Sequence, residues 1–193
     1  MKHPSTRALY EYWNERRGAR SAPERGDIEP GAIGRALGDS FILAFDAAAC
    51  HPFRIAGTRL CGLFARELRG APFETLWQRS DRTAIRDLVT AVADETAGVI
   101  AGITGRNEDG DAIELELLLL PLRHRGLTHA RQIGGFAPFT VPFWLGSNPV
   151  VELALGAWRH LGRASERGVP TPFVVAHGGR PQRGLVIFDG GRA

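Results

Sequence analysis

Residues 111–122 read Asp-Ala-Ile-Glu-Leu-Glu-Leu-Leu-Leu-Leu-Pro-Leu and carry the clearest alternation of apolar and polar side chains in the chain. Successive side chains of a β-strand point to opposite faces, so one face of this strand is apolar. That face consists of Ile113, Leu115, Leu117 and Leu119. The other face begins with Glu114 and Glu116 and ends with Leu118 and Leu120. We therefore expect one face in a core and the far end of the other covered, with the N-terminal helix as the candidate cover.

Two further strands flank this one. The segment 98–107 ends at the turn Asn107-Glu108-Asp109-Gly110, and the segment 129–138 follows the turn His124-Arg125-Gly126. Tight turns join neighbouring strands, so the three segments predict an antiparallel meander. Three glycines lie in the first segment, at Gly98, Gly102 and Gly105. They indicate either room beside a helix or β-bulges.

A long helix is expected over residues 81–97, with Ser80 or Asp81 as its N-cap. Its apolar side chains form one stripe, which consists of Ile85, Leu88, Val89, Val92, Ala93 and Thr96. A helix with one apolar stripe buries that stripe against another element. We expect it to lie across the apolar face of a curled antiparallel sheet.

Shorter elements precede the long helix. The apolar runs 40–46 and 53–56 flank Cys50-His51-Pro52 and predict a hairpin. Short helices are expected at 30–37, around Leu60, Leu63 and Phe64, and from Pro72 to Trp77. Residues 5–17 predict an N-terminal helix capped by Ser5 or Thr6, followed by a linker over 18–31.

The pattern weakens after residue 140. Val150 to Leu161 predicts a helix with Val151, Leu155 and Trp158 on one stripe. A tail rich in Gly, Pro and Arg follows, with apolar patches at Phe173-Val174-Val175 and at 185–188.

Composition limits the classes of function. The 193 residues fit one domain with extensions, and the formal net charge is only +3. Lys2 is the only lysine, and acidic residues are interspersed with the arginines, so no nucleic-acid footprint is evident. There is no signal-peptide pattern, and no apolar run reaches the roughly 18–20 residues of a membrane helix. Cys50 and Cys61 do not make a disulfide framework. We expect a soluble, cytoplasmic protein with reduced thiols.

The order of elements and several local stretches resemble the PAS domain family. Phe53-Arg54-Ile55-Ala56-Gly57-Thr58, with Leu68-Arg69-Gly70 further on, resembles the helical passage after the second PAS strand. Trp77 with Ser80-Asp81-Arg82 is similar to the entry of the long PAS helix, and Leu9-Tyr10-Glu11-Tyr12-Trp13 is similar to small stand-alone bacterial PAS-like proteins of unknown ligand. The resemblance covers roughly residues 5–140.

The resemblance implies an α+β fold, with a five-stranded antiparallel sheet and short helices and one long helix on one face. We expect an N-terminal helical extension over 1–37, the PAS-like domain over 38–141, and a C-terminal helix and tail over 142–193. Fold alone does not give function, so the functional implications remain analogies.

Those implications concern a ligand pocket and a dimer. The candidate pocket residues lie between sheet and helices, and they are Leu60, Cys61, Phe64, Trp77, Leu88, Val92, Leu115 and Leu117. Core packing also explains these side chains without a ligand. Leu9, Tyr12 and Trp13 are the candidate dimer interface, because two aromatic side chains on a short helix must be covered by the domain or by a second copy.

No cofactor or metal is identified. Cys61 lies near the position of the flavin-reactive cysteine of photosensory PAS domains, but the flanking Asn, Arg and Gln are missing. Residues 72–103 contain no His for haem, so we expect neither flavin nor haem. We expect His51, His124 and His129 to be exposed turn residues, since their spacing matches no zinc pattern.

Catalytic motifs are also missing. The sequence contains no Gly-x-Ser-x-Gly elbow and no phosphate-cradling or dinucleotide glycine loop. Glu114 and Glu116 share one strand face about 7 Å apart by strand geometry. We expect a solvated face or arginine partners for them, and we expect no enzyme.

The leading hypothesis is a signalling module that binds a small ligand or docks on a partner and shifts the packing of its N-terminal helix. Homodimerisation through that helix is expected. A ligand-free protein-interaction adaptor is the first alternative, and an Arg-rich anion or nucleic-acid binder is the second.

Overall fold

The structure is a computed structural model that describes residues 1–95 and 97–161, with the backbone alone at 95, 128 and 129. The described chain contains α-helices, 3-10 helices (η) and β-strands. In chain order they are α1 (Pro4–Arg17), η1 (Arg25–Asp27), α2 (Pro30–Ile33), η2 (Gly34–Asp39), β1 (Ser40–Ala44), β2 (Phe53–Ala56), α3 (Thr58–Leu63), η3 (Phe73–Leu76), α4 (Arg82–Glu95), β3 (Gly98–Arg106), β4 (Ala112–His124), β5 (Leu127–Pro138) and β6 (Glu152–Leu161).

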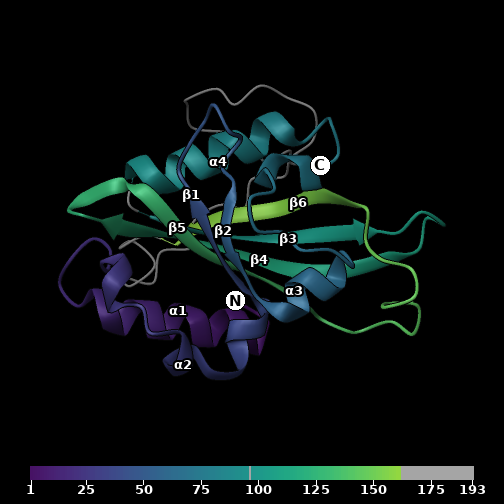
Figure 1. Cartoon of the computed structure of the whole chain (residues 1–193), viewed down its shortest axis with the longest axis horizontal. Helices are drawn as coiled ribbons and strands as arrows, with labels where there is room; N and C mark the ends of the chain where they lie inside the picture. Colours follow the sequence, from purple (N-terminus) through teal and green to yellow (C-terminus); the bar gives the residue numbers. More distant parts are fainter. Residues whose placement is uncertain (96, 162–193) are drawn as a thin grey trace, which may run out of the picture.

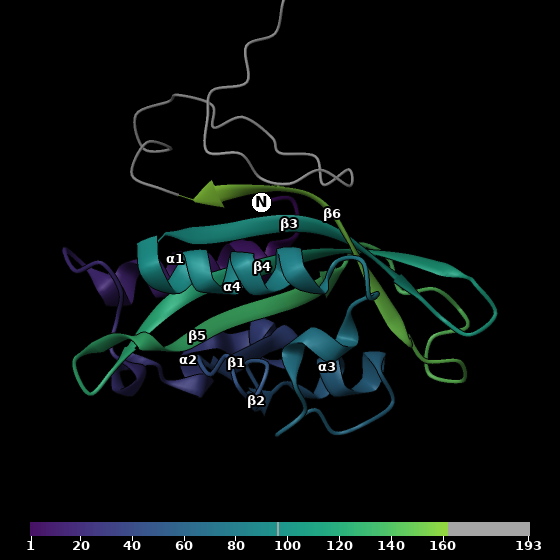
Figure 2. The same cartoon turned by 90° about the horizontal axis from the view of Figure 1, so that it is seen from above.

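All six strands join one antiparallel sheet in the order β2-β1-β5-β4-β3-β6. Figure 2 shows β6 along one edge of the sheet and β1 and β2 toward the other. The meander β3-β4-β5 and the hairpin β1-β2 are confirmed. The expected strand count of five is wrong, because β6 extends the sheet beyond β3.

The helix expected over Val150 to Leu161 is therefore wrong as well. The apolar side chains at 151, 155 and 158 mimic helical spacing, but pairing with β3 makes the segment a strand. A β-bulge falls opposite Gly102, where Ala101 pairs with Trp158 and Ile103 pairs with Leu155. The other edge of β6 contacts the loop before α4. There the backbone N–H of Leu155 donates to the carboxylate of Asp81 at 2.7 Å.

The sheet separates two helical layers. Figure 1 shows α4 on one side of the sheet and α1 and α2 on the other. The apolar stripe of α4 is buried from Ile85 to Ala93 against a sheet wall that includes Ile113, Leu115, Leu117 and Leu119. This packing confirms the prediction that the apolar stripe of the long helix lies across the apolar face of the sheet. Thr96, at the end of the stripe, lies outside the described residues.

Helix α1 covers the opposite face of the sheet. Leu9 and Trp13 pack there against Leu118 and Leu120, which confirms that the far end of the second face of β4 is covered. The N-cap of α1 is His3 rather than Ser5 or Thr6, because the imidazole Nδ1 accepts the Ser5 N–H at 3.0 Å. The helix ends at Gly18, whose positive φ of 54° is a conformation that glycine adopts without steric penalty.

None of the helices in the described part of the chain is long and apolar enough to cross a membrane. The two apolar patches expected in the tail, at 173–175 and 185–188, lie outside the described residues.

Candidate functional site

The two faces of the sheet each carry an apolar core, which we call the inner core and the outer core. The inner core lies between the sheet and α3, η3 and α4. It contains seven of the eight candidate pocket residues as buried side chains, which are Leu60, Phe64, Trp77, Leu88, Val92, Leu115 and Leu117. Cys61 is half-buried at its rim, where the thiol is 3.7 Å from Glu67 Oε1. The structure thus brings the predicted residues together.

Aromatic rings fill the centre of the inner core. The Phe73 ring lies 5.6 Å from that of Phe53, 5.7 Å from Phe41 and 6.0 Å from Phe136, centroid to centroid. Trp77 adds a further edge contact to Phe73 at 5.8 Å. Such tilted and edge-to-face contacts are the favoured geometry for aromatic pairs. Side chains from β1, β2, η3 and β5 therefore interlock at this point.

Two polar atoms lie inside this apolar layer without a hydrogen-bond partner among the described residues. They are the indole Nε1 of Trp77 and the side-chain Oε1 of Gln132. Both side chains are fully buried, and the Gln132 amide nitrogen donates to the carbonyl of Val89 on α4. A buried polar atom without a partner is costly in free energy. Gln132 was missed in the sequence, although a polar residue at an inward position of the last strand is an available signal.

His51 is a third buried polar group, and the expectation that it is exposed is wrong. Its side chain is 0% exposed and stacks on Phe45 at 5.1 Å. Nδ1 accepts the backbone N–H of Asp46 at 3.2 Å, while Nε2 lies 4.0 Å from the buried carboxylate of Glu74. Burial lowers the pKa of His51 despite the opposing charge of Glu74. The lowered pKa favours the neutral imidazole, and because Nδ1 accepts a hydrogen bond, we assign the proton of that form to Nε2.

Glu74 links three elements around His51. From η3 it accepts two hydrogen bonds from the guanidinium of Arg86 on α4, at 3.1 and 2.5 Å. The Glu74 carboxylate also faces His51, which lies in the connection between β1 and β2. His124 is half-exposed, and the side chain of His129 is not described. No group of three or more His, Cys, Asp or Glu side chains within the described residues could hold a metal ion.

The outer core consists of α1, α2 and their connections packed on the opposite face of the sheet. Its buried members are Leu9, Tyr12, Trp13, Ala22, Ile28, Ile33, Ala36, Ile42, Ile100, Leu118, Leu120, Leu122 and Ile133. The Trp13 indole donates to the Pro121 carbonyl at 2.8 Å. Its neighbours Leu9 and Tyr12 are also buried within one chain. The domain itself therefore covers these three side chains in the single chain, and homodimerisation through this helix stays a prediction.

Glu116 anchors the start of α1, and the expectation that it is solvated is wrong. Its side chain is only 5% exposed. The carboxylate accepts the backbone N–H groups of Lys2 and His3, at 2.7 and 3.0 Å, and the hydroxyl of Thr6. Burial alone would raise the pKa of Glu116, but these hydrogen bonds outweigh it and lower the pKa below its ordinary value. Glu114, two residues earlier, is exposed as expected.

The glycines of β3 do not leave room beside α4. A Cβ on Gly98 would meet the side chain of Leu120, which belongs to the outer core. A Cβ on Gly105 would meet Ile113 and Val150 of the inner core at 2.9 and 3.1 Å. Gly102 instead lies at the bulge with β6, as the second interpretation predicts. Close packing and a bulge therefore account for the three positions.

An antiparallel sheet with a long helix on one face and a docked N-terminal helix on the other defines an α+β domain of the PAS type. The PAS domain profile matches residues 1–137, and the chain belongs to this family. The match includes α1, so the N-terminal helix is part of the family pattern. Domains of this family are typically sensory rather than enzymatic, which gives the chain a coarse role in signalling.

Solved structures with a similar arrangement are light-oxygen-voltage proteins. One from Rhodobacter sphaeroides is 9% identical with a TM-score of 0.44, over 54% of this chain and 61% of its own. A light-oxygen-voltage domain studied with a flavin analogue is 15% identical with a TM-score of 0.45, over 61% of this chain and 87% of its own. An RNA-binding light-oxygen-voltage receptor is 25% identical with a TM-score of 0.44, over 61% of this chain and 36% of its own.

The chain thus spans about three fifths of the Rhodobacter protein and about a third of the RNA-binding receptor. No curated protein matches this chain.

Proposed function

We propose that this chain is a signalling PAS domain whose output is the docking and release of α1 on the outer face of its sheet. The observation that carries the proposal is the separate outer core, which a single N-terminal segment builds against β1, β3, β4 and β5. Release of this segment would expose a large apolar face, and such a face is a binding surface for a partner.

The contacts that hold α1 on the sheet are of a kind that can form and break reversibly. Its anchor is polar at both ends, with the Glu116 carboxylate at the first turn and the Pro121 carbonyl at Trp13. Between these anchors the contact is apolar and contains no covalent or metal link among the described residues. Two packings of one helix differ only by the free energy of such contacts, so a ligand or partner that prefers one packing shifts the population.

The decisive experiment is hydrogen–deuterium exchange on a Trp13→Ala variant. We expect the amides of α1 to exchange at least tenfold faster, because the variant loses a buried aromatic side chain and its hydrogen bond. The amides of β3 and β4 should keep their protection. Glu11→Ala, on the exposed side of the same helix, is the matched control and should leave α1 unchanged.

Two results would contradict the proposal. The first is unchanged exchange of α1 in Trp13→Ala. The second is simultaneous loss of protection over α1 and the whole sheet, because α1 would then belong to one cooperative unit and could not act as a separate output.

Small-ligand binding in the inner layer is a second candidate function. The buried Trp77 Nε1 and Gln132 Oε1 favour it, since a ligand would supply the hydrogen-bond partners that they lack among the described residues. Native and denatured masses of protein purified without added ligand test this candidate. A retained small molecule that a Gln132→Leu variant loses would support it, and a bare chain mass would favour a ligand-free adaptor.

A further inference from the structure

Three arginines from distant parts of the sequence converge near one end of the sheet. Arg131 on β5 pairs with Ala44 of β1 on one side and with Leu122 of β4 on the other. Arg54 is the extra residue of a β-bulge in β2, which pairs with β1 and so lies two strands from β5. Neighbouring strands are about 4.8 Å apart, so two such spacings are within reach of extended arginine side chains.

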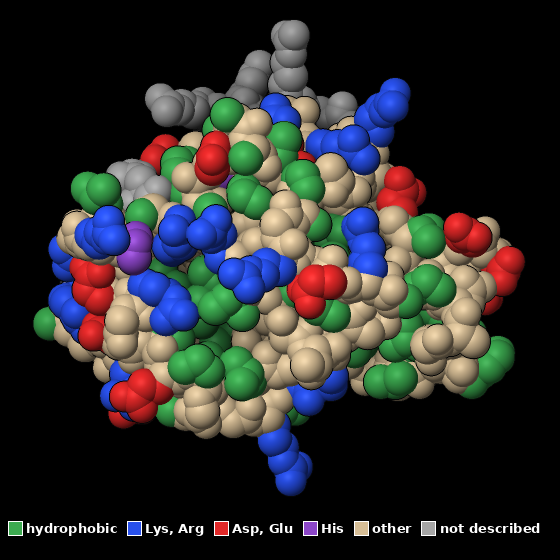
Figure 3. Space-filling model, viewed as in Figure 1, with side chains coloured by type: hydrophobic (Ala, Val, Ile, Leu, Met, Phe, Trp, Pro, Cys, Tyr) green, Lys and Arg blue, Asp and Glu red, His purple; other side chains and the backbone are tan. Residues whose placement is uncertain are grey.

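Arg25 approaches the same place from the N-terminal segment. Its neighbour Glu24 forms a β-bridge with Arg123, the residue after Leu122. Burial of Arg131, followed by the nearby charges of Arg54 and Arg25, lowers the pKa of the Arg131 guanidinium. Figure 3 shows Lys and Arg side chains gathered over β1, β2 and β5.

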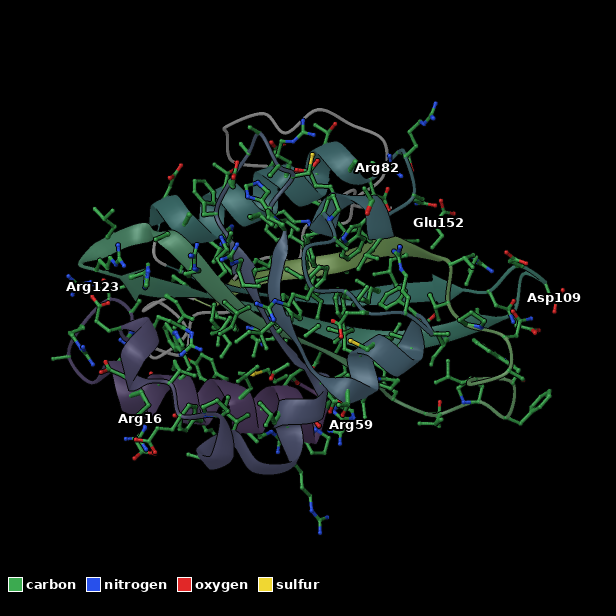
Figure 4. The ribbon with its side chains drawn as sticks, in the orientation of Figure 1. Arg16, Arg59, Arg82, Asp109, Arg123 and Glu152 are labelled. Atoms are coloured by element: carbon green, nitrogen blue, oxygen red, sulfur yellow. The ribbon has the colours of Figure 1, made fainter. Side chains whose placement is uncertain are left out.

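The three guanidinium groups make no ion pair with a described carboxylate. Three carboxylates that lie near the cluster in sequence have other partners. Glu24 lies 3.6 Å from Arg123, and Figure 4 shows Arg123 at this end of the molecule. Asp27 pairs with Arg20 at 2.7 Å. Asp46 accepts the backbone N–H of Ala49 at 3.1 Å.

The remaining hydrogen-bond donors of the cluster are numerous. Arg25 donates once to the Ile28 carbonyl at 3.4 Å, and Arg131 donates once to the Ala130 carbonyl at 2.9 Å. A guanidinium has five N–H donors, so most of them have no acceptor among the residues that the structure describes. Like charges held together repel one another, and a bound anion removes that repulsion while its oxygens accept the donors.

We propose that Arg25, Arg54 and Arg131 form a binding site for a small oxyanion with two or more negative charges, such as the phosphate group of a small molecule. The planar fork of each guanidinium matches the oxygens of such an anion. Arg54 also lines a surface hollow of about 370 Å³ with Ile55, Ala56, Glu67 and Arg69, and of the three arginines only Arg54 borders it. The anion site does not rest on the proposed release of α1, but Arg25 lies in the N-terminal segment and completes the site only while that segment is docked.

Calorimetric titration of the full chain with inorganic phosphate and with pyrophosphate tests the site. We expect saturable binding that is tighter for pyrophosphate and that weakens as salt rises. Arg131→Ala and Arg54→Ala should each weaken pyrophosphate binding at least tenfold. Arg79→Ala is the matched control, because it removes an equal charge from an exposed residue between η3 and α4.

Three outcomes would overturn the proposal. The first is no saturable binding of either anion at millimolar concentrations. The second is an equal loss of affinity in Arg131→Ala, Arg54→Ala and Arg79→Ala, which would indicate a response to net charge alone. The third is binding of a single-stranded oligonucleotide but of neither inorganic anion, which would assign these arginines to a nucleic acid. Arg54 is exposed, so its variant remains informative if Arg131→Ala does not fold.

Discussion

The inner and outer cores cover opposite faces of one sheet but differ in how they are built. The inner core draws on β1, β2, α3, η3, α4 and the strands of the meander, and its centre is a group of aromatic rings. The outer core draws on one contiguous N-terminal segment and the sheet, and polar contacts fix its ends. One face thus depends on most of the described chain, whereas the other depends on a single N-terminal segment.

Under the proposed function, this difference assigns folding to the inner core and signalling to the outer core. Loss of any part of the inner core removes contacts to many elements, so that core stabilises the domain as a whole. The segment that builds the outer core contributes no strand to the sheet, so we expect the sheet to stay paired when this segment is lost. We therefore expect substitutions on the inner face to act on global stability and those on the outer face to act on the position of α1.

The largest effect is expected for Phe73→Ala in the inner core. Phe73 is fully buried and contacts rings from three strands, so the variant leaves a cavity among aromatic side chains. We expect the free energy of unfolding to fall by about 3–5 kcal/mol in urea titrations. Phe143→Ala is the control, since Phe143 is 98% exposed, and its loss should stay within about 0.5 kcal/mol. Equal losses in the two variants would contradict a tightly packed inner core.

An intermediate effect is expected for Glu116→Gln at the anchor of α1. The charged hydrogen bonds to this carboxylate predict a loss of about 1.5–3 kcal/mol near neutral pH. The pKa of folded Glu116 is lowered, so its stabilising contribution is present above about pH 4.3, the unfolded value, and is lost as pH falls through the folded pKa.

The matched control for this substitution is Glu114→Gln, two residues earlier on the same face. Glu114 is exposed, and its carboxylate accepts a hydrogen bond from Thr104 at 2.9 Å. Urea titrations of both variants between acid and neutral pH compare them directly. Identical pH profiles for the two variants would show that the contact of Glu116 with α1 does not stabilise the fold.

The smallest effect is expected from the titration of His51 on the inner face. Burial lowers the folded pKa of His51, with Glu74 opposing and Arg86 reinforcing the shift. As pH falls below about 6.5, His51 binds a proton in the unfolded chain but not in the folded chain. The free energy of unfolding therefore decreases until pH passes the folded pKa of His51.

His51→Gln should flatten the stability profile in this window, and His124→Gln, at a half-exposed position, should not. Thermal unfolding midpoints measured across the window would reveal the difference. A wild-type profile that stays flat between pH 7 and 5, roughly the range in which histidine titrates, would refute the neutral buried imidazole.

Periodicity was sufficient to predict the elements that follow a regular pattern. The alternation from Ile113 to Leu119 and the stripe of α4 require opposing apolar partners, and the structure pairs them. The helix predicted at the position of β6 failed because the spacing of Val151, Leu155 and Trp158 fits both structures. Only pairing with β3 decides between them, and a sequence window does not contain β3.

The burial of the polar groups in the candidate sites was not predicted, because it too depends on elements distant in the sequence. Glu116 occupies a position that reads as solvent-facing, and only the return of the N-terminal segment buries it. His51 lies in a turn by sequence, and η3 and α4 close over it through Glu74 and Arg86. Burial by a distant element leaves no local mark, whereas Leu118 and Leu120 did mark the face that α1 covers.

The pairing of β1 with β5 has a consequence for the newly made chain. β5 lies between β1 and β4, so the first hairpin and the later meander meet only through this strand. A ribosome delivers β1 long before β5, and until then β1 pairs only with β2 and has no link to the meander. Nascent chains that stop before Leu127 should therefore recruit chaperones, and those long enough to free Pro138 from the ribosome should escape them.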